Sequence, residues 1–106
     1  GTAAAFDSEG HKANAGIWWY LDFARAHGKP LIVPEWGVAP GSTGGNTTGD
    51  NPVFVTKMFE VFQNAHSTSH LAGECYFDDA MGSGNVDSDL INGGNPRSAA
   101  EYLRLY

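Results

Sequence analysis

Glu35 is the side chain best placed for chemistry in this sequence. It follows an apolar run and directly precedes Trp36 in the stretch GKPLIVPEWGV, residues 28–38. A carboxylate at the end of a buried parallel strand can point into a pocket from a rigid base, and an indole beside it can lower the local polarity or form a flat platform. The structural alternative is a glutamate that caps the next loop or pairs with Arg25 or Lys29.

Metal and cofactor sites have weaker signals. The histidines lack metal-binding spacing, so no zinc site is expected at His11, His27, His66 or His70. One acidic loop could bind calcium, but its spacing is not that of an EF-hand, and solvated loop acids are the expected alternative for Asp78, Asp79, Asp87 and Asp89, with Asn85. The GSTGG of residues 41–45 has no following lysine, unlike a phosphate-binding loop. We therefore expect no metal and no cofactor.

The composition excludes several classes of partner. The chain has 106 residues, which fits one small domain, and a net charge of −6 with only six Lys plus Arg. Without a basic stripe, it is not expected to bind nucleic acid or an anionic membrane surface. No stretch reaches the roughly 18 apolar residues of a membrane span. The opening GTAAAFDSEG lacks a methionine and a signal peptide, which favours a processed, excised or incomplete piece.

Helical and strand patterns alternate along the chain. They predict helices over residues 11–27, 52–64 and 96–106, and strands over 31–35 and 71–77. Asn51 and Asn95, each followed by proline, are the expected N-caps of the second and third helix. Residues 1–10, 36–50 and 78–95 are expected to be loops. The only cysteine, Cys75, lies in the second strand and is expected to be a small buried hydrophobe.

Alternating strands and helices predict a parallel sheet with right-handed crossovers. Both long loops follow strands, so they are expected on one face, where α/β folds bind ligands. Two parallel strands do not make a stable sheet alone, and each has an unpaired edge. We therefore expect the chain to need neighbours, either missing parts of its own fold or copies of itself.

Several stretches resemble the clan of retaining glycoside hydrolases built on (β/α)8 barrels. GKPLIVPEWGV resembles the seventh strand, most closely that of the mannanase-type family 26, with the cellulase-type family 5 as a relative. CYFDDA, residues 75–80, resembles the aromatic eighth strand. Residues 18–30 resemble the sixth helix, and residues 88–106 resemble the end of such a barrel. The resemblance covers nearly the whole chain but only about the last third of the family's fold.

This resemblance implies a fold and an activity. Residues 1–106 would be the C-terminal portion of a TIM barrel, with strands seven and eight and helices six to eight, completed by other chains or an oligomer. The parent enzyme would be secreted or extracellular and would cleave β-linked polysaccharide, mannan or glucan, by a retaining mechanism. Glu35 would be the nucleophile, and three aromatic residues would bind the substrate: Trp36, Tyr76 and Phe77. Packing in the barrel core is the structural alternative for these three rings.

The chain has no clear candidate for the catalytic acid/base residue. A retaining glycosidase needs two carboxyl groups about 5 Å apart, and in this clan the acid/base glutamate ends strand four, which the chain lacks. Glu74 is a possible substitute, but a buried, hydrogen-bonded carboxylate is the favoured interpretation. Strand alternation places Tyr76 and Phe77 on opposite faces, and Tyr76 is favoured to face the ligand.

Two other functions remain open. The chain could be a non-catalytic carbohydrate-binding or structural fragment, because the second carboxylate is missing. It could also be an unrelated α/β module that self-assembles. Trp18 and Trp19 are expected in the core and at an interface rather than in a sugar site.

Overall fold

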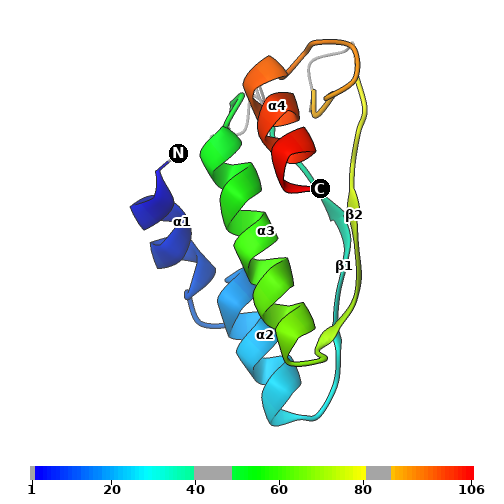
Figure 1. Cartoon of the computed structure of the whole chain (residues 1–106). Coiled ribbons are helices and arrows are strands. Elements are labelled where there is room, and N and C mark those ends of the chain that lie inside the picture. Colours follow the sequence, from blue (N-terminus) through cyan, green and yellow to red (C-terminus); the bar gives the residue numbers. More distant parts are fainter. Residues whose placement is uncertain (1, 40–48, 81–86) are drawn as a thin grey trace.

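The computed structural model describes residues 2–39, 49–80 and 87–106. In chain order the elements are α1 (Ala3–Gly10), α2 (Ile17–Ala26), β1 (Leu31–Trp36), α3 (Pro52–Ser67), β2 (Leu71–Tyr76) and α4 (Pro96–Leu105). The two strands pair in parallel, as expected, and α3 lies in the connection between them (Figure 1).

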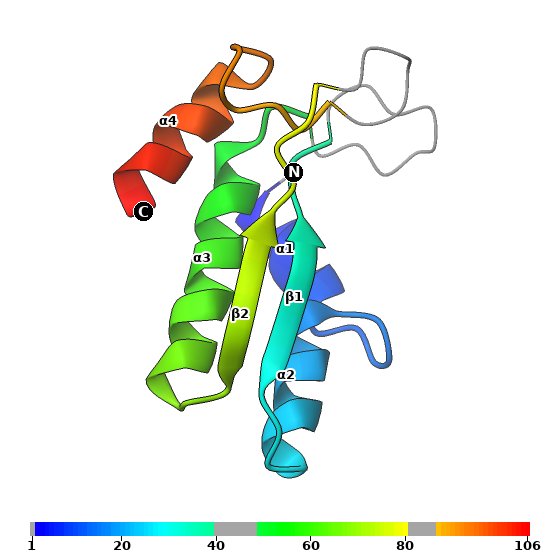
Figure 2. The same cartoon turned by 90° about the vertical axis from the view of Figure 1, so that its right-hand side faces the viewer.

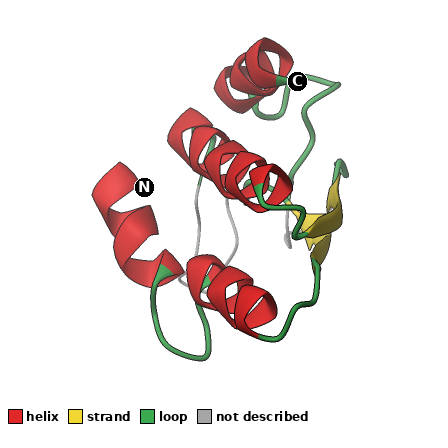
Figure 3. Ribbon diagram, turned by 60° about the horizontal axis from the view of Figure 1, so that its bottom comes forward, coloured by secondary structure: helices red, strands yellow, loops and turns green. Residues whose placement is uncertain are grey.

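The helices cover one face of the sheet, and α3 lies at the centre of the helical layer. Figure 1 shows the sheet edge-on with every helix on the same side, and Figure 2 looks onto its open face. In Figure 3, α3 lies between α4 and the pair α1 and α2, and it contacts all of these helices. Its buried face carries Val55, Met58, Val61, Phe62 and Ala65. This spacing of three and four residues is the apolar stripe of an amphipathic helix, and Leu21, Trp36 and Val38 pack against it.

The expectation of a TIM-barrel portion is wrong. In a (β/α)8 barrel each strand pairs on both sides, and the inner strand faces fill a common core. Here β1 and β2 pair only with each other within the described ranges, and Ile32 on the open sheet face is 63% exposed. The buried apolar side chains lie between the sheet and the helices of the same chain. The Cα radius of gyration is 14.0 Å, near the roughly 13 Å of a compact chain of this length.

The N-terminal segment is a helix rather than the expected loop. Thr2 caps α1 by accepting a hydrogen bond from the N–H of Ala5 at 3.2 Å. α2 then begins at Ile17 rather than near residue 11, with Gly16 as its N-cap. A Cβ on Gly16 would lie 2.0 Å from the carbonyl oxygen of Gly10, so only glycine allows this close approach between the two segments.

Asn51 and Asn95 both occupy the expected N-cap positions of α3 and α4, but only Asn51 caps its helix with its side chain. Asn51 accepts a hydrogen bond from the N–H of Phe54 at 3.2 Å. At α4 the cap comes from a residue distant in sequence, because Asp50 accepts hydrogen bonds from the N–H of Arg97 at 3.1 Å and of Ser98 at 2.8 Å. Asn95 is fully buried, and its side-chain amide donates to backbone carbonyls of the preceding loop. Asp50 thereby ties the start of α3 to the start of α4.

Removing the Asp50 cap is expected to destabilise the chain. Burial alone would raise the pKa of Asp50, but hydrogen bonds from Ser98 and Arg97 outweigh it, and the pKa is lowered. A lowered pKa in the folded state gives stability that is present above the ordinary aspartate value of about 3.9 and is lost as the pH falls through the folded-state value. We expect Asp50→Ala to lower the free energy of unfolding by about 0.5–2 kcal/mol near neutral pH, and by less below about pH 4.

Urea unfolding of the wild type and the variant over a pH series measures this effect. Asp79→Ala is the matched control, because the Asp79 side chain is exposed and makes no hydrogen bond or ion pair in the described part of the chain. An equal loss in both variants, or a loss for Asp50→Ala that is the same at acidic pH, would contradict the capping role.

Candidate functional site

A β-bulge determines where Glu35 points. Val33 pairs with Glu74 and Trp36 pairs with Tyr76, so three steps along β1 match two steps along β2. The extra residue falls at Pro34–Glu35, where proline has no N–H to donate to the ladder. Leu31 and Val33 pack on the core, and regular alternation would turn Glu35 inward too. The bulge instead buries Trp36 and leaves Glu35 exposed.

Glu35 is a carboxylate without a partner among the described residues. No hydrogen bond or ion pair involves its side chain there, so the structural alternative of a pair with Arg25 or Lys29 is not formed. Arg25 is bound elsewhere: its guanidinium donates to the Asn64 carbonyl at 3.0 Å and to Thr68 Oγ1 at 2.9 Å. Because β1 and β2 are parallel, Glu35 lies near the same carboxyl edge of the sheet as the end of β2.

Trp36 occupies the core rather than the surface. It is 6% exposed, and its indole Nε1 donates to a carboxylate oxygen of Glu74. Its ring centroid lies 5.4 Å from that of Phe62 and 4.9 Å from that of Tyr76. In this conformation the indole packs against tilted and edge-on protein rings and is almost fully covered, so the substrate-binding role expected of Trp36 has no open surface to use.

Glu74 interacts with aromatic residues, in line with the favoured structural interpretation. Its carboxylate accepts a hydrogen bond from the indole of Trp36 and acts electrostatically on the hydroxyl of Tyr106. Burial raises the pKa of the Tyr106 hydroxyl, and the negative charge of Glu74 raises it further. Glu74 therefore connects β1, β2 and the end of α4, and this use leaves it a poor substitute for the missing acid/base group.

Tyr76 joins the end of β2 to the segment that precedes α4. Its hydroxyl donates to the Ser88 carbonyl at 2.9 Å and accepts from the N–H of Val38 at 3.3 Å. Burial raises the pKa of Tyr76 to about 12. Phe77 is half-buried, and its N–H donates to the Trp36 carbonyl at 2.8 Å. Both residues thus hold the carboxyl ends of β1 and β2 together.

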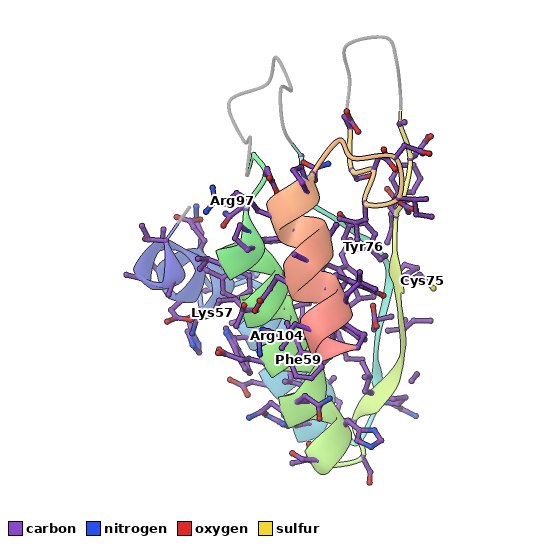
Figure 4. All side chains as sticks on the ribbon, turned by 45° about the horizontal axis from the view of Figure 1, so that its top comes forward. Lys57, Phe59, Cys75, Tyr76, Arg97 and Arg104 are labelled. Atoms are coloured by element: carbon purple, nitrogen blue, oxygen red, sulfur yellow. The ribbon has the colours of Figure 1, made fainter. Side chains whose placement is uncertain are left out.

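A cavity of about 570 Å³ opens beside Tyr76, and sequence analysis did not predict it. It lies between β2, the segment before α4 and α4 itself, and is lined by Cys75, Tyr76, Asp78, Leu90, Ile91, Ala99, Tyr102 and Leu103. The signal available in the sequence was the apolar stripe of the last helix, with Ala99 and Tyr102. Figure 4 shows Tyr76 on the side of β2 that faces α4.

Two expectations about side chains near this cavity are wrong. Cys75 is exposed rather than buried, because its position in β2 faces the open side of the sheet (Figure 4). Asp89 is 4% exposed rather than a solvated loop acid. Its carboxylate accepts hydrogen bonds from the N–H groups of Ile91 at 2.9 Å and Asn92 at 3.0 Å, which lower its pKa. Asp89 therefore shapes the loop before α4.

Some of the residues considered as metal or phosphate ligands lie in the described part of the chain. Within residues 2–39, 49–80 and 87–106, no group of three or more His, Cys, Asp or Glu side chains could hold a metal ion. Asn85 and residues 41–45 lie outside these ranges. No helix in the described ranges is long and apolar enough to cross a membrane.

Comparisons of the chain with protein-family models, with curated proteins and with solved structures found no match. The resemblance to retaining glycoside hydrolases therefore stays a prediction that rests on the sequence stretches quoted above.

Proposed function

We propose that this chain acts on β-linked polysaccharide of the mannan or glucan type as a retaining glycoside hydrolase, with Glu35 as the nucleophile. The observation that carries the proposal is the exposed Glu35 carboxylate, which has no partner in the described ranges and is held at the bulge of a paired strand. Bulges occur often beside active sites, where they re-aim a side chain. The resemblance of residues 28–38 to a nucleophile-bearing strand supports the same role.

The chemistry that Glu35 would perform is attack on the anomeric carbon. Its carboxylate oxygen forms a bond to that carbon while the glycosidic oxygen leaves with a proton, and water then hydrolyses the glycosyl ester. The neighbouring Trp36 is anchored in the core, which fixes the backbone from which Glu35 projects. The proton donor is a second carboxyl group, and Glu74 is committed to Trp36. Turnover therefore requires a carboxyl group other than that of Glu74 as the proton donor.

Non-catalytic carbohydrate binding is the second candidate, and an exposed aromatic row on α2 favours it. Trp19 stacks on Phe23 with ring centroids 5.4 Å apart, and Phe23 stacks on His27 at 4.1 Å. Phe23 is 49% exposed and Tyr20 is 45% exposed. Sugar rings have apolar C–H faces that pack on such side chains, and binding of this kind needs no second carboxylate.

Two measurements on the purified chain separate these functions. The first follows release of reducing sugar from β-mannan and β-glucan, and of the phenol from an activated aryl β-glycoside. The second follows tryptophan fluorescence during titration with mannan and glucan oligosaccharides. Sugar release supports the hydrolase. Saturable oligosaccharide binding without sugar release, weakened by Phe23→Ala, supports the binding function. If the chain neither releases sugar nor binds oligosaccharide, both proposed functions are wrong.

A further inference from the structure

The cavity beside Tyr76 combines an apolar lining with one carboxylate. Four of its lining side chains are aliphatic and two are tyrosine rings, Tyr76 and Tyr102, whose centroids lie 5.4 Å apart. Its volume of about 570 Å³ is within the range of about 300–1,000 Å³ that small organic ligands occupy in proteins. A ligand of this size would bury apolar surface against the rings and the aliphatic side chains.

Asp78 is the charged residue of the cavity lining, and one of its two carboxylate oxygens accepts a hydrogen bond from the protein. Oδ1 accepts a hydrogen bond from the N–H of Leu90 at 2.7 Å. Oδ2 has no partner in the described part of the chain, and the side chain is exposed. One carboxylate oxygen is therefore held in place by the loop and the other is open to a ligand.

The charges around the cavity are negative. Asp78 and Glu74 act electrostatically on the Tyr102 hydroxyl, and Asp78 and Asp89 act on that of Tyr76. No arginine or lysine lines the cavity, and the nearby Arg104 is bound to Glu101 at 2.8 Å. Aromatic ring faces also attract cations. A negative ligand would be repelled here, whereas a positive one would gain from Asp78 and from the rings.

Two exposed aliphatic side chains extend the apolar lining outward. Ile91 is 80% exposed and Leu103 is 82% exposed, and both line the cavity. Ile91 comes from the loop before α4, and Leu103 comes from α4 itself. An organic body that is wider than an ammonium ion would contact both.

We propose that this cavity binds a small organic cation with an aromatic or branched aliphatic body, with the positive group on Asp78 Oδ2 and the body between Tyr76, Tyr102 and Leu103. This site is separate from the Glu35 carboxylate and does not depend on the proposed hydrolase. It assigns a ligand class to a cavity that the proposed attack by Glu35 does not use.

Benzamidine and benzamide test the proposal, because the two probes have nearly the same shape but only benzamidine is charged. Backbone-amide NMR of the full chain locates the binding. We expect benzamidine to cause saturable shifts at Leu90, Ile91 and the first turns of α4, and benzamide to bind at least about tenfold more weakly, a difference of about 1.4 kcal/mol. Shifts that do not saturate, that map elsewhere, or that are equal for the two probes would overturn the proposal.

Three variants make the test specific. Asp78→Asn is expected to weaken benzamidine about tenfold, since its amide oxygen can still accept from Leu90 and keep the loop in place. Asp79→Asn changes charge equally one residue away, outside the lining, and should leave binding within about twofold. Ala99→Leu fills the cavity with a good helix former and should abolish binding while the circular dichroism spectrum is kept. Equal effects of Asp78→Asn and Asp79→Asn, or full binding by Ala99→Leu, would refute the site.

Discussion

Glu35→Gln is expected to abolish sugar release while the fold stays intact. A neutral amide cannot attack the anomeric carbon, and loss of a nucleophile commonly lowers turnover by about 10⁴-fold or more. The side chain is exposed and has no partner in the described ranges, so the free energy of unfolding should change by no more than about 0.5 kcal/mol. Hydrolysis of an activated aryl β-glycoside and urea unfolding, measured on the same preparation, check the two parts of this prediction.

Glu9→Gln is the matched control for this substitution. Glu9 is also an exposed glutamate, and its ion pair with Lys12 at 3.7 Å lies on the surface, where such pairs contribute little. It should keep full turnover and full stability. Unchanged sugar release by Glu35→Gln would remove the nucleophile assignment. A loss of more than about 2 kcal/mol in stability would instead make Glu35 a structural carboxylate.

Much of the framework around Glu35 could be predicted because local signals agree with the packing. The runs that became β1 and β2 are apolar and short, and the parallel pairing followed from the helix between them. α3 carries an apolar stripe and an Asn51–Pro52 start, so its position was predictable and only its end at Ser67 was not. α1 lacks such a stripe. Its helix is supported by a tertiary contact, the edge of Phe6 on Phe54 at 5.8 Å, which no local pattern shows.

The orientation of the site residues depends on contacts between distant segments, so the sequence could not predict it. Alternation along β1 fails at Pro34, because the bulge there shows only in the pairing with β2. The resemblance implied that Trp36 binds the substrate, whereas its indole packs in the core against α3 and α4. The cavity likewise forms only when α4 lies beside β2. Asp50, which lies 48 residues before Ser98 in the chain, helps to position α4 by accepting a hydrogen bond from the Ser98 N–H.

Trp36→Ala is expected to cause the largest loss of stability in the chain. The indole is 6% exposed and contacts the rings of Phe54, Phe62, Tyr76 and Tyr102. Removing a buried tryptophan side chain costs about 3–5 kcal/mol, a large share of the 5–15 kcal/mol that holds a typical domain folded. The variant also leaves Glu74 without the indole donor in a half-buried position, which adds to the loss. Thermal and urea unfolding followed by circular dichroism measure it.

Trp19→Ala and Trp36→Phe show whether this loss comes from the position of Trp36. Trp19 lies on the outer side of α2 with partial exposure, so the same truncation there should cost about 1 kcal/mol. Phenylalanine at position 36 keeps an aromatic ring in the cluster but gives Glu74 no donor, so its loss should lie between those of the two alanine variants. If Trp36→Ala stays as stable as Trp19→Ala and loses oligosaccharide binding instead, the indole is a sugar platform after all, and the core position of Trp36 is not its functional one. If Trp36→Ala shows the expected loss of stability, Trp36 affects the site only by fixing the backbone beside Glu35. The sugar must then be recognised by other side chains near Glu35.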